Sequence, residues 1–140
     1  MYYIIGLTGP LSSGKHVVAE YLKNKGFECY SLSQVVRDEA KLRGIKEERE
    51  KLQNLGNLLR ETFGTGILAD RIKKKLDYSK NIIIDGIRNP GEVTSLRELK
   101  NFILIGVTAS KEIRFTRVLS RNRESDPKSF EEFLRLEGKR

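Results

Sequence analysis

Apolar residues recur along this chain in short runs that are separated by longer stretches of helical spacing. The short runs are rich in β-branched residues, as buried parallel strands are, and they cover residues 2–7, 28–31, 81–84 and 102–107. Apolar positions elsewhere return every three or four residues, which predicts helices over 17–23, 33–43, 47–63, 66–76, from Pro90, 110–122 and 130–136. Strands separated by helices predict an α/β domain, in which a parallel sheet of about four strands carries helices on both faces.

Several side chains have an expected place in this fold. In the first helix, the spacing of Val17, Val18, Tyr21 and Leu22 predicts that they face the core. Ser33 is expected to cap the helix that follows the second strand, because a serine hydroxyl can accept a hydrogen bond from an unpaired amide of the first turn.

The length of 140 residues suits a single domain spanning 1–140. The lone cysteine, Cys29, cannot form an internal disulfide, and its apolar neighbours predict a small buried residue. No apolar run approaches the ~20 residues that cross a bilayer, and the N-terminus lacks the pattern of an export signal. We therefore expect a cytoplasmic protein without a membrane anchor.

The chain is basic, with 27 Lys and Arg against 19 Asp and Glu and a net charge of +8. Most of these charges alternate with acidic residues, as in 46–51, which is typical of a solvated surface. The exception is 114–123, which holds four arginines and no acidic residue. Such a cluster suits a polyphosphate at least as well as a duplex, and the chain lacks a recognition helix or interleaved stacking aromatics. These features argue against a nucleic-acid partner.

The residues after the first strand carry the strongest chemical signal. They read Gly-Pro-Leu-Ser-Ser-Gly-Lys-His over 9–16, which is the pattern G-x-x-x-x-G-K-[ST] with histidine in the last place. Between a strand and a helix, such a loop turns backbone amides and the positive end of the helix toward phosphate oxygens, and its lysine adds a mobile charge. The predicted phosphate-binding residues are Gly9, Pro10, Leu11, Ser12, Ser13, Gly14, Lys15, His16 and Val17.

A carboxylate follows the third strand, at Asp85-Gly86. An acidic residue opposite a phosphate loop can hold Mg²⁺, directly or through water. The alternative is an ordinary Asp-Gly turn at the end of a strand. Together with the upstream loop, the pattern favours the magnesium role for Asp85.

Four segments together resemble a known group of proteins. They look like the corresponding segments of the nucleoside monophosphate kinases of the P-loop class. Within that class they are most similar to dephospho-CoA kinases and deoxynucleotide monophosphate kinase-like proteins. The four segments are 9–15, 31–37, 85–88 and 117–123. The resemblance covers nearly the whole chain in order. It implies a three-layer P-loop fold with a short arginine-rich lid.

The resemblance also implies roles for individual residues. Ser33 and Arg37 match the acceptor side, where the arginine grips the acceptor's phosphate, and Arg88 matches a second acceptor arginine. Arg117, Arg121 and Arg123 fall where the lid closes over the phosphates, with Arg121 as a catalytic residue beside Lys15 and Asp85.

Each arginine also has a plain alternative. Arg37 could be an exposed helical residue and Arg88 a turn residue, while Arg114, Arg117 and Arg121 could form one solvated helix face. Arg60 and Arg71 flank 63–66 and could line the acceptor side, or could simply face solvent.

Three departures limit the likeness. His16 replaces the hydroxyl that ligates magnesium, and Gln34 stands where adenylate-kinase-like members usually have aspartate. The chain ends at Arg140, before the fifth strand and closing helix common in this group, so a minimal or a truncated member is expected.

The function that follows is transfer of the γ-phosphate of ATP, with Mg²⁺, to a small nucleotide-type acceptor: a nucleoside or deoxynucleoside monophosphate, or dephospho-CoA. One alternative is a nucleotide-binding sensor that kept the fold and lost turnover. A nucleic-acid-binding module is a third reading, which rests on net charge alone. The acceptor, the base preference and the oligomeric state stay open.

Overall fold

The computed structural model describes residues 2–10, 12–121 and 126–137. Within these ranges the backbone forms the strands and helices that the hydrophobic pattern predicts. In chain order they are β1 Ile4–Thr8, α1 Lys15–Asn24, β2 Glu28–Ser31, α2 Leu32–Arg43, α3 Arg49–Phe63, α4 Ile67–Lys73, β3 Ile82–Asp85, α5 Pro90–Leu96, β4 Phe102–Gly106, α6 Lys111–Arg121 and α7 Phe130–Glu137. The predicted α/β class is confirmed.

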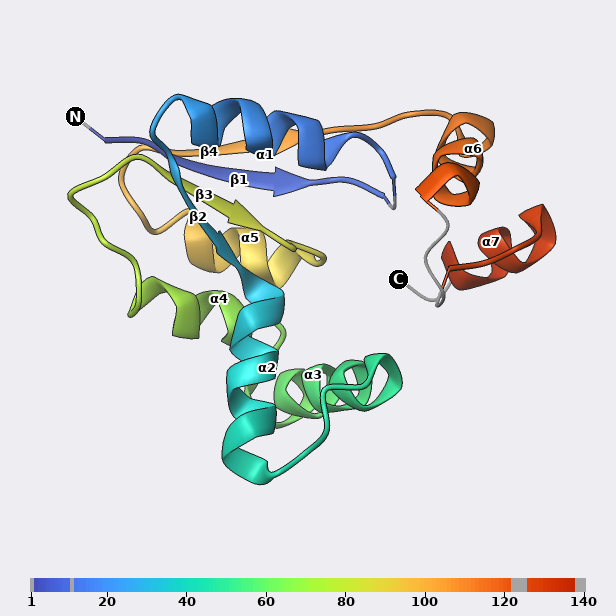
Figure 1. Cartoon of the computed structure of the whole chain (residues 1–140). Coiled ribbons are helices and arrows are strands. Elements are labelled where there is room, and N and C mark those ends of the chain that lie inside the picture. The colour runs from blue at the N-terminus through green and yellow to red at the C-terminus, as the bar shows by residue number, and fades with distance from the viewer. Residues whose placement is uncertain (1, 11, 122–125, 138–140) are drawn as a thin grey trace.

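The four strands form one parallel sheet in the order β2-β3-β1-β4. Gly6 of β1 pairs with Ile84 of β3 on one side and with Leu104 of β4 on the other. Helix α1 covers one face of the sheet, while α2, α4 and α5 lie on the opposite side (Figure 1). Helices α6 and α7 lie beyond the carboxyl ends of the strands. Ligands of open parallel sheets bind at that edge.

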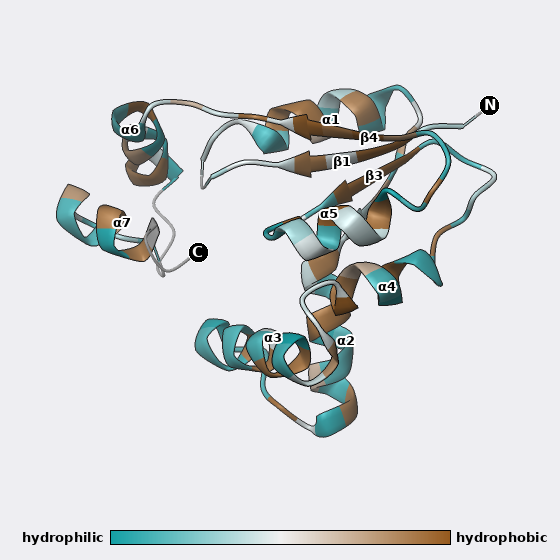
Figure 2. Cartoon of the chain, turned by 180° about the vertical axis from the view of Figure 1, so that it is seen from behind, coloured by the Kyte–Doolittle hydropathy of each residue, from teal (hydrophilic) through white to brown (hydrophobic). Residues whose placement is uncertain are grey.

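Alternate strand residues face two separate cores. Ile5, Leu7 and Ile83 pack with Ala19 of α1. The intervening strand positions, such as Ile84, pack against the larger core formed by α2 to α5. Strands buried on both faces need apolar residues at successive positions, which is why β1 and β3 appear as largely hydrophobic ribbons in Figure 2.

Helix α1 is rotated relative to the expectation from its sequence. Val17 and Tyr21 are 70% and 61% exposed, so the prediction that they face the core was wrong. Ala19 is buried instead, with Val18 and Leu22 packed beside it. The helix begins directly at the glycine loop after β1, and this connection fixes which face meets the sheet.

Two smaller predictions were also wrong. Cys29 is exposed rather than buried, because β2 is an edge strand of the sheet. The cap of α2 is Ser31 rather than Ser33, because the Ser31 hydroxyl accepts a hydrogen bond from the Ser33 amide.

Among the described residues, none of the helices combines the length and the apolar character that a membrane span requires.

Helices α6 and α7 share a small aromatic cluster of their own. The rings of Phe115, Phe130 and Phe133 lie 5.4–6.2 Å apart between centroids. The guanidinium of Arg114 lies 5.4 Å from the Phe133 ring centre, and Arg114 is only 3% exposed. Arg114 is therefore part of this packing, which rules out one solvated face shared by Arg114, Arg117 and Arg121.

Candidate functional site

The loop after β1 has a backbone shape that only some residues tolerate. Gly9 and Gly14 have φ of 152° and 105°, and Ser12 has φ of 57°. A Cβ at Gly9 would collide with the backbone oxygen of Val107. Glycine is required at such positions because it alone avoids both the left-handed strain and the clash. The loop therefore turns tightly between β1 and α1, as its sequence predicts; Leu11 lies outside the described residues.

This loop delivers the start of α1 to the edge of the sheet. Gly14 is the N-cap, and in the described structure no side chain caps the first turn. The exposed amides and the helix dipole make this end attractive to an anion. Lys15 lies half-buried at the first helical position, while His16 is exposed. Ser13 is 4% exposed, and within the described ranges its hydroxyl has no hydrogen-bond partner.

Helix α6 brings one of the predicted lid arginines to the loop. Arg117 donates from Nη1 to the Ser12 carbonyl oxygen, over 3.0 Å. Arg121 instead pairs with Asp126. Arg114 donates from Nε to the Ala109 carbonyl oxygen. Arg123, the remaining lid prediction, lies outside the described residues. The structure thus places Arg117, and not Arg121, against the phosphate loop.

Asp85 ends β3 beside this loop. Its Oδ1 accepts a hydrogen bond from the Gly86 amide over 2.8 Å, so a local turn engages one carboxylate oxygen. In the described part of the chain, no three His, Cys, Asp or Glu side chains gather as a metal site would require. A single carboxylate still suits Mg²⁺, which commonly takes one or two carboxylates and completes its shell with substrate phosphates and water. A magnesium role for Asp85 would therefore require further ligands from a bound polyphosphate and water.

A threonine joins the loop's strand to the segment after β3. Thr8, the last residue of β1, donates from Oγ1 to the Ile87 carbonyl oxygen over 3.0 Å. The neighbouring residue along that segment is Arg88. The phosphate loop and Arg88 are consequently anchored to the same two strands.

A cavity of about 810 Å³ opens on the other side of Arg88, between α2, α3 and α7. The cavity wall carries four arginines: Arg37, Arg49, Arg60 and Arg88. Glu47 is the acidic residue among the lining side chains. The predicted residues Ser33, Arg37, Arg60 and Arg88 are brought together here. Arg49 was missed, because it stands in the mixed-charge run 46–51 that resembles a solvated surface.

Arg37 and Arg88 show the surroundings of the charges in this cavity. Arg37 donates from Nη1 to the Ser33 hydroxyl over 3.1 Å, and that hydroxyl is 2.8 Å from the Ser31 hydroxyl. The pKa of Arg88 is lowered, first by loss of hydration and then by the neighbouring Arg60 guanidinium. Positive groups held this close repel one another, so an anion between them would be stabilised.

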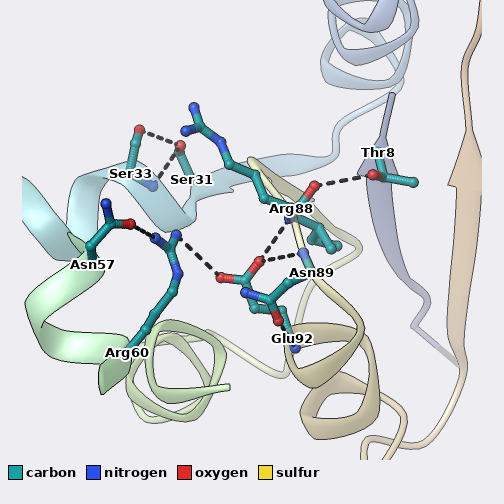
Figure 3. A network of polar contacts seen from close by, with 9 residues as sticks. Thr8, Ser31, Ser33, Asn57, Arg60, Arg88, Asn89 and Glu92 are labelled. Carbon is teal, nitrogen blue, oxygen red and sulfur yellow. Dashed lines mark hydrogen bonds and ion pairs between the residues drawn. The ribbon is translucent and has the colours of Figure 1, made fainter. Parts of the chain in front are cut away.

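A buried glutamate lies beneath two of these arginines (Figure 3). Glu92 is fully buried and accepts hydrogen bonds at Oε1 from the amides of Arg88, over 2.7 Å, and Asn89, over 3.2 Å. Asn89 accepts in return from the Glu92 amide, so the two form the capping box of α5. Oε2 lies 3.8 Å from Nη2 of Arg60. Burial raises the pKa of Glu92, against the pull of these amides and of Arg60.

The sequence analysis did not identify Glu92, although Asn89-Pro-Gly-Glu92 has the spacing of a capping box.

Arg71, the other candidate on the acceptor side, points away from the cavity. Its Nη1 donates to Glu39 over 2.7 Å, and its guanidinium lies 5.4 Å from the Phe63 ring centre. Arg60 lines the cavity and Arg71 does not.

Comparison with known proteins identifies the family. The AAA domain family model matches residues 5–135. The chain belongs to this family. A UPF0200 protein from Hyperthermus butylicus is 36% identical over 132 residues, covering 93% of this chain and 71% of the relative.

Two solved structures show the same fold. TT1252 from Thermus thermophilus superposes with a TM-score of 0.60 and 22% identity, over 99% of this chain and 79% of that one. A sugar kinase from Janibacter sp. HTCC2649 gives a TM-score of 0.53 and 14% identity, over 99% of this chain and 77% of that one. At these identities the likeness concerns the fold alone.

Proposed function

We propose that this AAA-domain protein binds ATP and transfers its γ-phosphate to a small nucleotide-type acceptor. The observation that carries the proposal is the pairing of two anion-binding regions at one edge of the sheet. One is the glycine loop before α1, and the other is the arginine-lined cavity beyond Arg88. Phosphoryl transfer between two nucleotides requires both of them to be held next to each other.

On the donor side, the loop amides and Lys15 bind the β- and γ-phosphates. Arg117 already contacts the loop and supplies a further positive charge when the nucleotide is bound. Mg²⁺, held by Asp85 and the nucleotide, would neutralise charge on the phosphate oxygens. Arg121 reaches the transferred group only if it leaves Asp126, so Arg117 is the arginine best placed for this role.

On the acceptor side, Arg37, Arg60 and Arg88 hold the phosphate of the second ligand, and Ser33 orients Arg37. With a monophosphate acceptor, an oxygen of that phosphate attacks the γ-phosphorus; with dephospho-CoA, a ribose hydroxyl does so and loses its proton. The bond to the β–γ bridging oxygen breaks, and its electron pair leaves with ADP. The residues of this chain contribute mainly position and positive charge, which is what a loose phosphoryl-transfer transition state requires.

The direct test is ATP binding by calorimetry in the Lys15→Ala variant. We expect most of the affinity to be lost, because the loop amides alone cannot replace the lysine charge at the phosphates. Lys25→Ala, at the opposite end of α1, is the matched control and should bind as the wild type does. Unchanged affinity in Lys15→Ala would reject the phosphate-loop assignment.

One observation favours a second candidate, a nucleotide sensor with little or no turnover. His16 is exposed at the position where the motif needs a small hydroxyl ligand for Mg²⁺. Imidazole is bulkier and a poorer match for this ion. A sensor would bind ATP tightly and fail to phosphorylate any of a panel of monophosphates or dephospho-CoA.

A further inference from the structure

The acceptor cavity is larger than its arginines need. About 810 Å³ exceeds the space of a phosphate group many times and lies within the range of sites that enclose whole small molecules. The arginines near Arg88 account for the anionic part of a ligand. The remaining wall must therefore contact a second, uncharged part of the acceptor.

The uncharged part of the wall combines apolar and amide side chains. Leu52 comes from α3, while Phe133 and Leu136 come from α7. Gln53 and Asn57 are one helical turn apart on α3, so both amides line the same stretch of the cavity. Apolar surfaces with a few amides suit a flat, hydrogen-bonding ring such as a nucleobase.

The orientation of the Asn57 amide follows from its neighbour. Arg60 donates from Nη1 to Asn57 Oδ1 over 3.4 Å. A guanidinium has donors only, so the side-chain oxygen of Asn57 must face Arg60 and the amide nitrogen must point away. Figure 3 shows this nitrogen directed away from Arg60, on the side where Ser33 lies. Ser33 lines the same cavity, so Asn57 presents hydrogen-bond donors to a ligand there.

The same guanidinium also faces a buried carboxylate. Its Nη2 lies 3.8 Å from the buried Glu92 carboxylate. Gly56, between the two amide residues, is buried and has no side chain that could fill the space; a Cβ there would lie 3.4 Å from Arg60 Nη1. Arg60 thus faces the Glu92 carboxylate with Nη2 and the Asn57 oxygen with Nη1.

We propose that Asn57 makes the acceptor cavity select nucleotides whose base presents a carbonyl oxygen over those that present an amino group at the same place. The inference rests on the proposed function, because it assigns the base subsite of the same cavity. A donor meeting a carbonyl forms a hydrogen bond, whereas a donor meeting an amino group leaves two donors unpaired. The Gln53 amide, with no such arginine partner among the described contacts, adapts to either face.

The test compares two matched pairs of monophosphates by calorimetry: IMP with AMP, and UMP with CMP. Within each pair an oxygen replaces an amino group at one ring position, and the adjacent ring nitrogen gains a hydrogen. The wild type should bind the carbonyl member about tenfold more tightly, equivalent to ~1.4 kcal/mol. Asn57→Asp presents an acceptor instead of a donor and should reverse both ratios. Any added repulsion of the phosphate acts on both members of a pair, so the ratio isolates the base.

Two further variants complete the experiment. Asn57→Ala should remove the discrimination without reversing it. Asn54→Asp makes the same chemical change on the same helix at an exposed position outside the cavity lining, and should leave both ratios as in the wild type. Thermal melting of each variant checks that it is folded.

The outcomes separate this inference from the proposed function. If monophosphates bind but the wild type favours amino bases or neither, or if Asn57→Asp keeps the wild-type ratios, the role of Asn57 is rejected and the acceptor site stands. If ATP binds and no monophosphate does, both the acceptor site and this inference are rejected. If ATP also fails to bind, the proposed function is rejected as a whole.

Discussion

Arg121 and Asp126 form a two-pronged ion pair, with Nε 2.6 Å from Oδ2 and Nη2 2.7 Å from Oδ1. The Asp126 side chain is 3% exposed and that of Arg121 is 27% exposed. A planar guanidinium matches a carboxylate in this geometry, which makes such pairs stronger than single contacts. The pair joins the end of α6 to the segment before α7, and the Arg114–Phe133 contact joins the two helices.

Replacing Arg121 with alanine should therefore lower the free energy of unfolding. The buried Asp126 carboxylate would lose both hydrogen bonds from Arg121, and we expect a loss of about 1–3 kcal/mol. Arg135→Ala, at an exposed position of α7, serves as the control and should change stability little. Equal stability of the two variants in chemical denaturation would contradict the structural role of Arg121.

The acceptor arginines can be separated from the donor site by binding measurements. Arg37→Ala and Arg88→Ala should each weaken a monophosphate acceptor by at least about tenfold, because hydrogen bonds to charged groups are lost. ATP affinity should change little. Arg71→Ala removes an arginine that pairs with Glu39 outside the cavity and should affect neither ligand. The two-site assignment is wrong if either acceptor variant loses ATP and monophosphate equally.

A substitution at His16 can distinguish an active phosphotransferase from a nucleotide sensor. Restoring the hydroxyl with His16→Thr should speed Mg²⁺-dependent transfer by at least about tenfold, or ~1.4 kcal/mol in the barrier, because a hydroxyl ligates Mg²⁺ at ~2.1 Å. Val17→Thr adds a hydroxyl at the adjacent exposed position and should have no such effect. Assays would use a monophosphate panel with Mg²⁺ or Mn²⁺. If His16→Thr is no faster with either ion, His16 is not the defect, and absence of turnover in both proteins supports the sensor.

Burial of Glu92 predicts a pH dependence of stability. Its pKa is raised from the ordinary 4.5, so the unfolded chain ionises this group first as the pH rises. The contribution of Glu92 to stability is thus full below about pH 4.5 and declines as the pH passes the folded-state pKa. Glu92→Gln keeps an oxygen for the cap and cannot ionise. Urea unfolding from pH 4 to 7.5 should show the variant gaining on the wild type as the pH rises; a constant difference would contradict the prediction.

Local patterns predicted the elements of this fold well. The apolar run before Asp85 became β3, and Pro90 opened α5 as expected, because neither depends on distant residues. The rotation of α1 was mispredicted, since Val17 and Tyr21 satisfy helical spacing as well as the residues that are buried. Which face meets the sheet depends on how the glycine loop joins α1 to β1, and helical spacing alone does not show this.

For the candidate site, the sequence indicated individual residues but not which of them pair with one another. The loop glycines and Arg88 carry recognisable local patterns, so their positions could be inferred. Two other features could not be inferred from the sequence: the burial of Glu92 beside Arg60, and the pairing of Arg121 with Asp126. Each depends on where separate segments meet in space. Charge patterns along a sequence show which residues are ionic but not which ions face each other.

The hydrogen bond from Thr8 to Ile87 has a consequence for motion. It links the end of β1 to the segment after β3, and the backbones of these strands are already paired in register. The separation between the donor loop and Arg88 is therefore set by the rigid sheet, whereas the width of the cavity depends on α3 and α7. Any change in the positions of α3 and α7 would thus alter the size of the cavity, while the sheet would keep the spacing between the glycine loop and Arg88.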